Sequence, residues 1–263
     1  MLVLIRGAGD LATGVAVRLI RAGCCVVLCD IAQPTSIRRT VAFSEAVRLG
    51  ETSVEGIRAR YAQSVEAALA LHAQGVVPVL CDPDARCLPA LRPGAVVDAI
   101  LAKRNLGTHI AMAPVVVALG PGFTAGQDCH AVVETMRGHD LGRVYYRGCA
   151  LPNTGVPGEI GGQSEKRVLR APADGRFTPL CSIGDAVSPG DTVGAVEGIP
   201  LRTQIGGVLR GILPDGLYVT KGFKAGDVDP RCERAHCFTV SDKARALGGG
   251  VLEAILHFTG GLS

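Results

Sequence analysis

The sequence contains no tryptophan, and aromatic residues make up only 4% of its 263 positions. It has no apolar run long enough to cross a bilayer and no basic run interleaved with aromatic side chains. The net charge of +3 is too small to indicate binding to nucleic acid. We therefore expect neither a membrane protein nor a nucleic-acid-binding protein.

A secretory leader and a metal-binding pattern are also missing. The apolar run after Met1 has no basic segment before it and soon ends in glycine, which is untypical of a signal peptide. The six histidines show no metal-ligand spacing, and the nearest cluster, Cys232, His236 and Cys237, lacks a second half. We expect no metal site, a soluble cytoplasmic protein, and ten cysteines that are mostly buried, reduced thiols.

Glycine and apolar residues are abundant instead. The 35 glycines suit tight turns, and the 48% apolar content argues against disorder. The length allows one large domain or two modest ones.

The first residues predict a strand, a glycine turn and an amphipathic helix. An apolar run over residues 2–5 leads into G-x-G-x-x-A, formed by Gly7, Gly9 and Ala12. A second apolar run ends in Asp30, where a dinucleotide-binding fold places the acid that holds a ribose. The glycines would let backbone N–H groups approach a phosphate at the helix N-terminus.

The same turn has a purely structural interpretation. The glycines would then only shape the turn, and Asp30 would only cap the segment after it. Asp10 is atypical for a phosphate site, because its carboxylate would repel the ligand. It could instead cap the helix, or contact a sugar hydroxyl or a cation. The candidate cofactor-binding residues in and around the turn are Arg6, Gly7, Gly9, Asp10, Thr13, Gly14 and Asp30.

Two further basic groups are candidates for binding an anionic ligand. Arg38 and Arg39 follow Asp30 closely, and Arg137 and His139 lie in a glycine-spaced loop after a predicted strand. Solvated surface charge is an equal alternative for both groups. No catalytic set is identified, and nothing ranks Cys149, Cys181 and Cys237 as reactive thiols.

Strand-like runs recur up to residue 135 with helical or turn segments between them, which predicts an α/β fold with a mostly parallel sheet. The predicted domains are a Rossmann-like domain over residues 1–147, a Gly/Pro-rich linker over 148–166, a β domain over 167–240 and a C-terminal helix over 241–263. Three successive glycines, 248–250, predict that this helix packs closely, and we expect it to return to the N-terminal sheet.

The β domain resembles the barrel-sandwich fold of biotinyl and lipoyl carriers. Its paired G-D-x-V turns, at Gly184-Asp185 and Gly190-Asp191, carry this resemblance. Carriers display a modifiable lysine at a hairpin tip, whereas this chain has Glu197-Gly198 there and no lysine between Lys166 and Lys221. The resemblance thus implies the fold without the carrier activity.

Over nearly its full length the chain resembles YqeB-type proteins, through IRGAGDLATGVAVRL, IRRTVAFSEAV, VEGI, RGHDLGRV, GGVLRGIL, KGFKAGDVDPR and SDKARALGGGVLEAIL. These are accessory proteins of selenium-dependent molybdenum hydroxylases, and their Rossmann part is similar to that of XdhC/CoxI-like maturation factors. Asp10 departs from the histidine that is usual in the XdhC-like turn.

The resemblance implies a maturation role. The protein would bind a molybdopterin-type cofactor or its cytidine dinucleotide while sulfur or selenium is installed, and then deliver it. Its partners would be the molybdenum hydroxylase apo-enzyme and other maturation proteins, with homo-oligomerisation left open. An NAD(P)-dependent oxidoreductase and a non-catalytic interaction module are the alternatives.

Overall fold

The computed structural model describes residues 1–261, which divide into two units. The first unit contains residues 1–34, 42–154 and the chain from Val240 onward, and the second contains residues 35–41 and 155–239. The longer segment of the second unit begins at Gly155, within the stretch 148–166 expected to be a linker. The second unit also takes in the short segment that carries Arg38 and Arg39.

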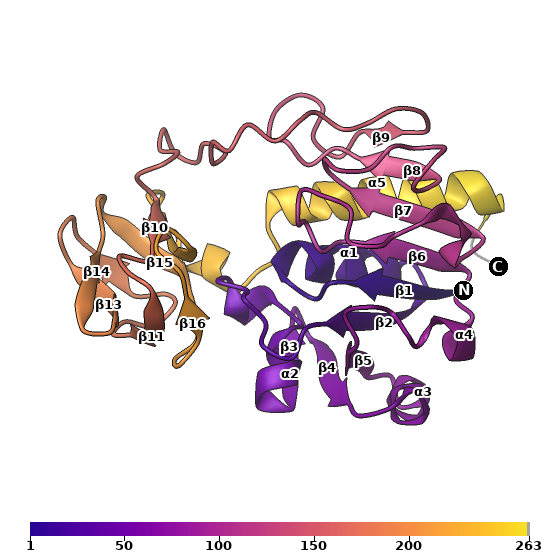
Figure 1. Ribbon diagram of the computed structural model, residues 1–263, viewed down its shortest axis with the longest axis horizontal. Helices are drawn as coiled ribbons and strands as arrows, with labels where there is room; N and C mark the ends of the chain where they lie inside the picture. Colours follow the sequence, from indigo (N-terminus) through magenta and orange to yellow (C-terminus); the bar gives the residue numbers. More distant parts are fainter. Residues whose placement is uncertain (262–263) are drawn as a thin grey trace. The chain divides into compact units, whose positions relative to one another are not determined.

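A mixed nine-stranded sheet forms the centre of the first unit within residues 1–261. Its strands are β1 (Leu2–Arg6), β2 (Cys25–Asp30), β3 (Glu51–Val54), β4 (Ile57–Ala62), β5 (Val77–Cys81), β6 (Ala95–Asp98), β7 (Val115–Leu119), β8 (Ala131–Val133) and β9 (Val144–Tyr145). Their order is β3-β4-β5-β2-β1-β6-β7-β8-β9, and the pairs from β4 to β8 are parallel, with an antiparallel strand at each edge. The predicted mostly parallel sheet is thus present (Figure 1).

The order in which strands are added to this sheet reverses at β1. The chain first builds outward through β2 and β5, then returns to place β6 on the other side of β1. The carboxyl ends of β1 and β6 therefore meet at a switch point, where open α/β sheets leave a crevice for ligands.

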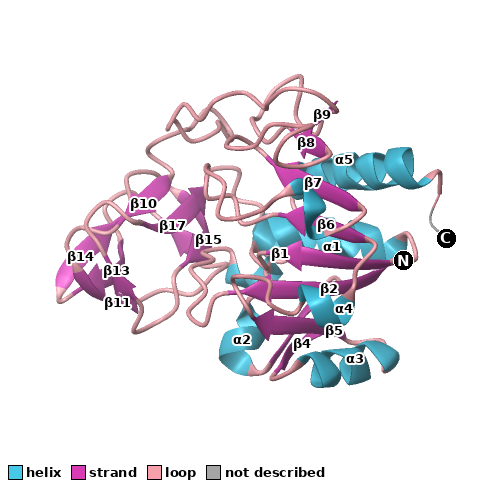
Figure 2. Ribbon diagram, turned by 45° about the vertical axis from the view of Figure 1, so that its right-hand side comes forward, coloured by secondary structure: helices cyan, strands magenta, loops and turns pink. Residues whose placement is uncertain are grey.

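Helices cover the sheet of the first unit (Figure 2). They are α1 (Asp10–Arg21), α2 (Glu45–Leu49), α3 (Val65–Ala73), α4 (Leu88–Leu91) and α5 (Asp242–Thr259), with a short 3-10 turn η2 (Ile110–Met112). Helices α3 and α4 contribute Ala68, Leu71 and Leu91 to a core that also contains Leu4 and Cys29. Ser64 caps α3 by accepting a hydrogen bond from the Ala67 N–H at 3.2 Å.

The C-terminal helix α5 packs against α1, as its glycines predict (Figure 1). A Cβ added to Gly248 would lie 2.8 Å from the Cβ of Arg18, and one added to Gly250 would lie 2.5 Å from the Gly142 carbonyl oxygen. Gly249 faces open space instead. Two of the three glycines are therefore explained by close packing, and Ser241 caps the helix at the Ala244 N–H.

The second unit is built from antiparallel strands. Its strands are β10 (Val168–Arg170), β11 (Gly175–Pro179), β12 (Ala186–Val187), β13 (Thr192–Val196), β14 (Ile199–Arg202), β15 (Gly207–Ile212), β16 (Tyr218–Val219) and β17 (Lys224–Asp229), with 3-10 turns η1 (Arg39–Val41) and η3 (Arg234–Cys237). Among the described residues they form two four-stranded sheets, ordered β10-β17-β15-β12 and β14-β13-β11-β16. Both sheets contribute to one core, which includes Phe177, Val193, Leu209 and Val228.

The two G-D-x-V segments form matching turns in this unit. The Asp185 carboxylate accepts a hydrogen bond from the Ser182 N–H at 2.8 Å, and the Asp191 carboxylate accepts one from the Ser188 N–H at 2.7 Å. At the β13–β14 hairpin, the Glu197 side chain accepts from the Arg176 N–H at 2.8 Å. Glu197 therefore has a structural contact at the tip where carriers display lysine.

Within residues 1–261, no helix combines the length and the hydropathy needed to cross a membrane.

Candidate nucleotide-binding edge and neighbouring clusters

The glycine turn lies at the switch point between β1 and β6. Gly7 has a φ of +98°, and a Cβ there would lie 2.8 Å from the Ala99 carbonyl oxygen, just past β6. Both its backbone conformation and its surroundings therefore require glycine. The fold alone therefore requires glycine at position 7, whether or not a ligand binds at the turn.

Asp30 lies against the same turn. One carboxylate oxygen accepts a hydrogen bond from the Ala8 N–H at 2.8 Å, and the other accepts from the Ile31 N–H at 2.8 Å. Burial raises the pKa of Asp30, against the effect of these two hydrogen bonds. The acid at the end of β2 thus fixes the glycine turn, and its oxygens keep lone pairs that a ligand hydroxyl can use.

Asp10 is the first residue of helix α1. An N-cap residue would instead lie just before the helix. Gly9 is the N-cap and makes no side-chain cap, whereas Asp10 lies in the first turn of the helix. The interpretation of Asp10 as the helix cap is therefore wrong. The positive end of the helix dipole favours the Asp10 carboxylate. Because the N-cap is glycine, it has no side chain to accept from the first helical N–H groups, which are the groups that bind anions at helix N-termini.

Thr13 and Gly14 have packing roles behind the turn. The Thr13 hydroxyl donates to the Ala8 carbonyl at 3.2 Å and accepts from the Phe43 N–H at 2.8 Å. A Cβ on Gly14 would lie 2.4 Å from the Cβ of Ala244, where α1 meets α5. Thr13 thus holds the backbone of the turn by hydrogen bonds, and Gly14 allows α1 and α5 to pack closely.

Arg6 belongs to a buried polar cluster at the end of β1 and β6. Its guanidinium donates to the Thr108 hydroxyl and, at 3.0 Å each, to the Pro83 and Leu106 carbonyls. Asp98 lies 3.6 Å away and accepts from the Thr108 hydroxyl at 2.5 Å. The Arg6 Nε is buried and has no hydrogen-bond partner within the described part of the chain.

The charge of Arg6 only partly offsets the cost of burying the Asp98 carboxylate. Burial raises the pKa of Asp98, although the Thr108 hydroxyl, the Ile100 N–H and Arg6 act to lower it. The loss of hydration therefore outweighs the attraction of the nearby cation.

Two thiols and a carboxylate gather at the ends of β2 and β5. The Cys29 and Cys87 sulfurs lie 3.6 Å apart. One ligand atom from each of Cys29, Asp82 and Cys87 lies within 4.8 Å of the other two. The hydrogen bond between the thiols, together with burial, raises the pKa of Cys29.

Arg38 and Arg39 lie in the second unit and contact backbone carbonyls there. Arg38 donates to the His236 carbonyl at 2.9 Å and the Thr239 carbonyl at 3.2 Å, and Arg39 donates to the Ile212 carbonyl at 2.8 Å. Arg38 is buried, whereas Arg39 is half-buried at a pocket.

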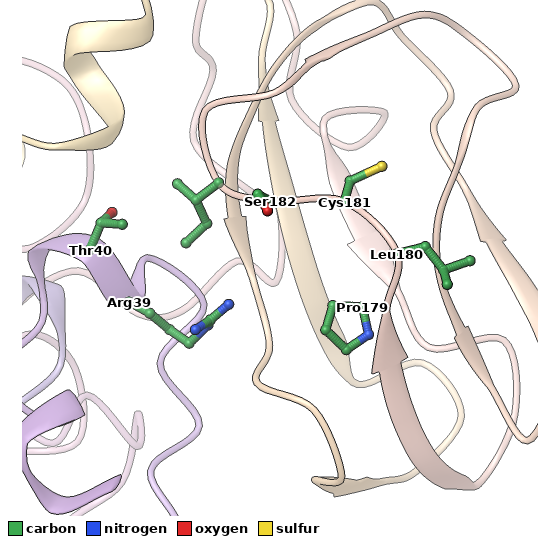
Figure 3. Close-up of a pocket in the computed structure, with 7 residues that line it drawn as sticks. Arg39, Thr40, Pro179, Leu180, Cys181 and Ser182 are labelled. Atoms are coloured by element: carbon green, nitrogen blue, oxygen red, sulfur yellow. The ribbon is translucent and has the colours of Figure 1, made fainter. Parts of the chain in front are cut away.

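The pocket beside Arg39 has a volume of about 420 Å³ (Figure 3). It is lined by Arg39, Thr40, Pro179, Leu180, Cys181, Ser182 and Ile183. The Cys181 sulfur points away from Arg39 in this view, and burial with Asp185 and Asp191 nearby raises the pKa of Cys181. Its thiol is therefore a poor nucleophile at neutral pH.

Arg137 and His139 have different surroundings in the structure. Arg137 makes a two-pronged ion pair with Asp242, at 2.7 Å and 3.0 Å, whereas His139 is exposed on the loop. Arg137 thus ties this loop to the start of α5.

Sequence reasoning missed Asp98, Thr108 and the Cys29–Asp82–Cys87 cluster. A signal for the cluster was present, since the tetrapeptide V-L-C-D occurs at residues 27–30 and again at 79–82. Each copy ends a strand, and β2 and β5 are parallel neighbours with Cys29 paired to Leu80. The repeated tetrapeptide therefore indicates two strands whose carboxyl ends lie side by side, which is where the cluster forms. Nothing comparable in the sequence indicates Thr108, because it reaches Asp98 from a loop.

Comparison with known proteins gives one strong sequence match. The chain is 55% identical over 255 residues to the uncharacterized protein YqeB of Escherichia coli strain K12, a match that covers 97% of this chain and 47% of that protein. This identity supports a relationship to the YqeB family. The chain spans about half the length of the curated YqeB protein. No family model matches the chain.

Solved structures give only weak matches. An aspartoacylase family protein from Mesorhizobium loti is 17% identical, with 56% of this chain and 60% of that chain covered at a TM-score of 0.24. The ectoine utilization protein EutE (DoeB) from Ruegeria pomeroyi, in its apo structure, is 12% identical, with 86% and 85% covered at a TM-score of 0.27. TM-scores this low do not identify a shared fold.

Proposed function

We propose that this chain is a maturation factor for a selenium-dependent molybdenum hydroxylase, and that it binds the molybdenum cofactor or its cytidine dinucleotide at the glycine turn. The observation that carries the proposal is the glycine N-cap of α1, which lies at the switch point of a parallel sheet and has no side-chain cap. A phosphate group fits the chemistry of this helix end. The YqeB relationship supports the molybdenum context, through the role that the resemblance implies.

On this proposal the first unit is a Rossmann-like, XdhC-like domain. The arrangement of β1, α1 and β2, with an acid at the end of β2, supports it. Asp30 would hold the turn and accept a hydrogen bond from a ligand hydroxyl. The molybdenum cofactor, when bound, would supply the metal chemistry, and the residues around the turn would bind and orient its phosphate.

The second unit would be a barrel-sandwich domain used for docking rather than for carrying a group. Its two four-stranded sheets and the paired Asp185 and Asp191 turns support the fold. Because Glu197 occupies the hairpin tip, no lysine is available there for attachment of a cofactor. The proposed partners are the apo-enzyme and other maturation proteins.

The test is to identify ligands that co-purify with the full chain from a host supplied with molybdate and selenite. The decisive variant is Gly9→Asp, which places a carboxylate where the phosphate would lie. Aspartate is a favourable N-cap residue, so the helix itself should keep its stability. Ser64→Asp is the control, because it introduces an aspartate at the N-cap of α3, away from the glycine turn.

Mass spectrometry should find a molybdopterin-type ligand on the wild-type chain and on Ser64→Asp, and none on Gly9→Asp. Retention of the same ligand by Gly9→Asp would place its site elsewhere and contradict the proposal.

A second candidate is an NAD(P)-dependent oxidoreductase, favoured by Asp30 at the end of β2. It predicts that the purified chain binds NAD or NADP and that Asp30→Ala weakens that binding. Tight nicotinamide binding without any affinity for a molybdopterin-type ligand would replace the maturation proposal with this one.

A further inference from the structure

The Cys29–Asp82–Cys87 cluster lies where two parallel strands end. Cys29 is the second-last residue of β2, and Asp82 follows directly on β5. The Asp82 N–H donates to the Asp30 carbonyl at 3.1 Å, which continues the β2–β5 pairing by one step. The sheet register therefore fixes the distance between the Cys29 and Asp82 backbones.

A short turn then brings Cys87 back to Cys29. The Asp82 carboxylate accepts from the Arg86 N–H at 2.9 Å with one oxygen and from the Cys87 N–H at 2.8 Å with the other. The carboxylate is thus held in a fixed orientation, just as hydrogen bonds to the metal-binding side chains of known sites orient those side chains. Cys29 and Cys87 are 1% and 6% exposed, so their sulfurs are also held by packing.

The geometry suits a tetrahedral cation. Two sulfurs bound to one Zn²⁺ at about 2.3 Å each lie about 3.8 Å apart in a tetrahedral site. The Cys29 and Cys87 sulfurs lie 3.6 Å apart, so little movement is needed. Thiolate ligands select zinc and softer metals over Mg²⁺ or Ca²⁺.

A buried cation lies close to the cluster. Two thiolates and one carboxylate around a divalent cation leave one negative charge. The buried Arg6 guanidinium, which also lies 3.6 Å from Asp98, supplies a positive charge nearby. It donates to the carbonyl of Pro83, the residue after Asp82. Buried charge is tolerated when it is compensated in this way.

We propose that Cys29, Asp82 and Cys87 bind a borderline-soft divalent cation of the Zn²⁺ type, with one coordination position left for water or a further ligand. The three ligands are not among the residues proposed to bind a phosphate at the glycine turn, although the Cys29 carbonyl accepts from the Gly7 N–H at 2.7 Å, and the site does not depend on the maturation role. Binding joins the 82–87 turn to the end of β2. Asp82 is half-buried, whereas both sulfurs are buried, so the cation enters past the carboxylate.

The experiment uses the full chain, freed of metal with a chelator and kept reduced with a phosphine. Co²⁺ is titrated as the probe, because thiolate ligation gives a charge-transfer band in the near ultraviolet, and Zn²⁺ is then added to displace it. We expect about one Co²⁺ per chain with a thiolate band. We expect Cys87→Ser and Asp82→Asn to weaken the affinity by at least about tenfold.

Cys81→Ser is the matched control, because Cys81 is an exposed thiol on β5 next to Asp82 but outside the cluster. It should bind Co²⁺ as the wild-type chain does. Circular dichroism checks that each variant is folded, and Asp82→Asn keeps the test valid if the cysteine variants do not fold.

Three results would overturn the proposal. The first is a reduced wild-type chain that shows no thiolate band. The second is a folded Cys29→Ala/Cys87→Ala variant that keeps the band. The third is a Cys29–Cys87 disulfide in air, seen as a 2 Da mass loss, in a chain that binds no Co²⁺ when reduced; this would identify a redox pair instead.

Discussion

The two units compensate their buried charges in different ways. In the second unit, Asp227 on β17 makes ion pairs with Arg167 and Arg210, and Asp229 on the same strand lies 3.3 Å from Arg210 and 2.6 Å from Arg231. Each acid there has two arginine partners. Arg6 of the first unit instead donates to a hydroxyl and two carbonyls, and its nearest acid is 3.6 Å away.

The two acids respond to these surroundings with opposite pKa shifts. Burial acts to raise the pKa of Asp229, but hydrogen bonds from Arg231 and the charges of Arg210 and Arg231 lower it to about 2. Burial raises the pKa of Asp98, because its compensation is weaker. Direct ion pairs therefore favour the charged acid in the second unit, and their near absence disfavours it at the edge of the sheet.

Both units also pack backbone closely against backbone, and in the first unit this packing joins α1 and α5. Gly14, Gly248 and Gly250 bring α1, α5 and a neighbouring loop closer than any side chain would allow. The two units therefore differ in how their buried acids are compensated: the β17 acids have direct arginine partners, whereas Asp98 at the sheet edge has only the more distant Arg6. The following experiments test this difference and the close packing of α5.

The largest effect is expected for Asp227→Asn. It leaves Arg167 and Arg210 buried without a charged partner at this position, which should destabilise the second unit by about 3–5 kcal/mol. Denaturant unfolding of the full chain, followed by circular dichroism, measures the change. The exposed Asp215→Asn should change stability by less than about 0.5 kcal/mol. Equal effects of the two variants would show that the ion pairs contribute little.

Acid should next destabilise the second unit through Asp229. Its folded pKa of about 2 lies below the ordinary 3.8, so the unfolded chain binds more protons between these values. The stabilisation is present above about pH 4 and is lost as the pH falls toward 2, by about 2.5 kcal/mol. Unfolding measured between pH 5 and 2 should show this loss, and Asp229→Asn should reduce its pH dependence.

Gly250→Ala should destabilise the first unit by about 2 kcal/mol, because the new Cβ would lie 2.5 Å from the Gly142 carbonyl oxygen. Gly249→Ala is the matched control in the same helix and meets no atom within 4 Å. It should stabilise the protein by about 0.5–1 kcal/mol, since alanine favours the helix. Thermal unfolding of both variants tests the packing, and two changes of the same sign would contradict it.

Asp98→Asn should have the smallest effect. The folded pKa of Asp98 is raised, so its stabilising contribution belongs to the protonated form, present below about pH 3.8 and lost as the pH rises through the folded pKa. A neutral asparagine should therefore change stability at pH 7 by less than about 1 kcal/mol. A loss as large as that of Asp227→Asn would remove the difference between the two units.

Much of the fold could be predicted from local patterns. The apolar runs predicted β1, β2, β5 and β7 to within a few residues, and Ser241 marked the start of α5. The predicted strand over 95–101 ends early, at Asp98, and Ala99 just after it packs against Gly7. The hairpin of β3 and β4 was missed, since its turn at Glu55-Gly56 lies between short, polar strands.

Local sequence is enough to specify the glycine turn, the strand that precedes it and the acid that follows, because each depends on backbone conformation and short-range periodicity. Which charges meet depends instead on the tertiary fold. Arg38 and Arg39 bind carbonyls of the second unit, Arg137 binds Asp242, and Cys29 meets Cys87. Such contacts join residues that lie far apart in the chain, so they depend on strand order and loop paths that no local pattern encodes.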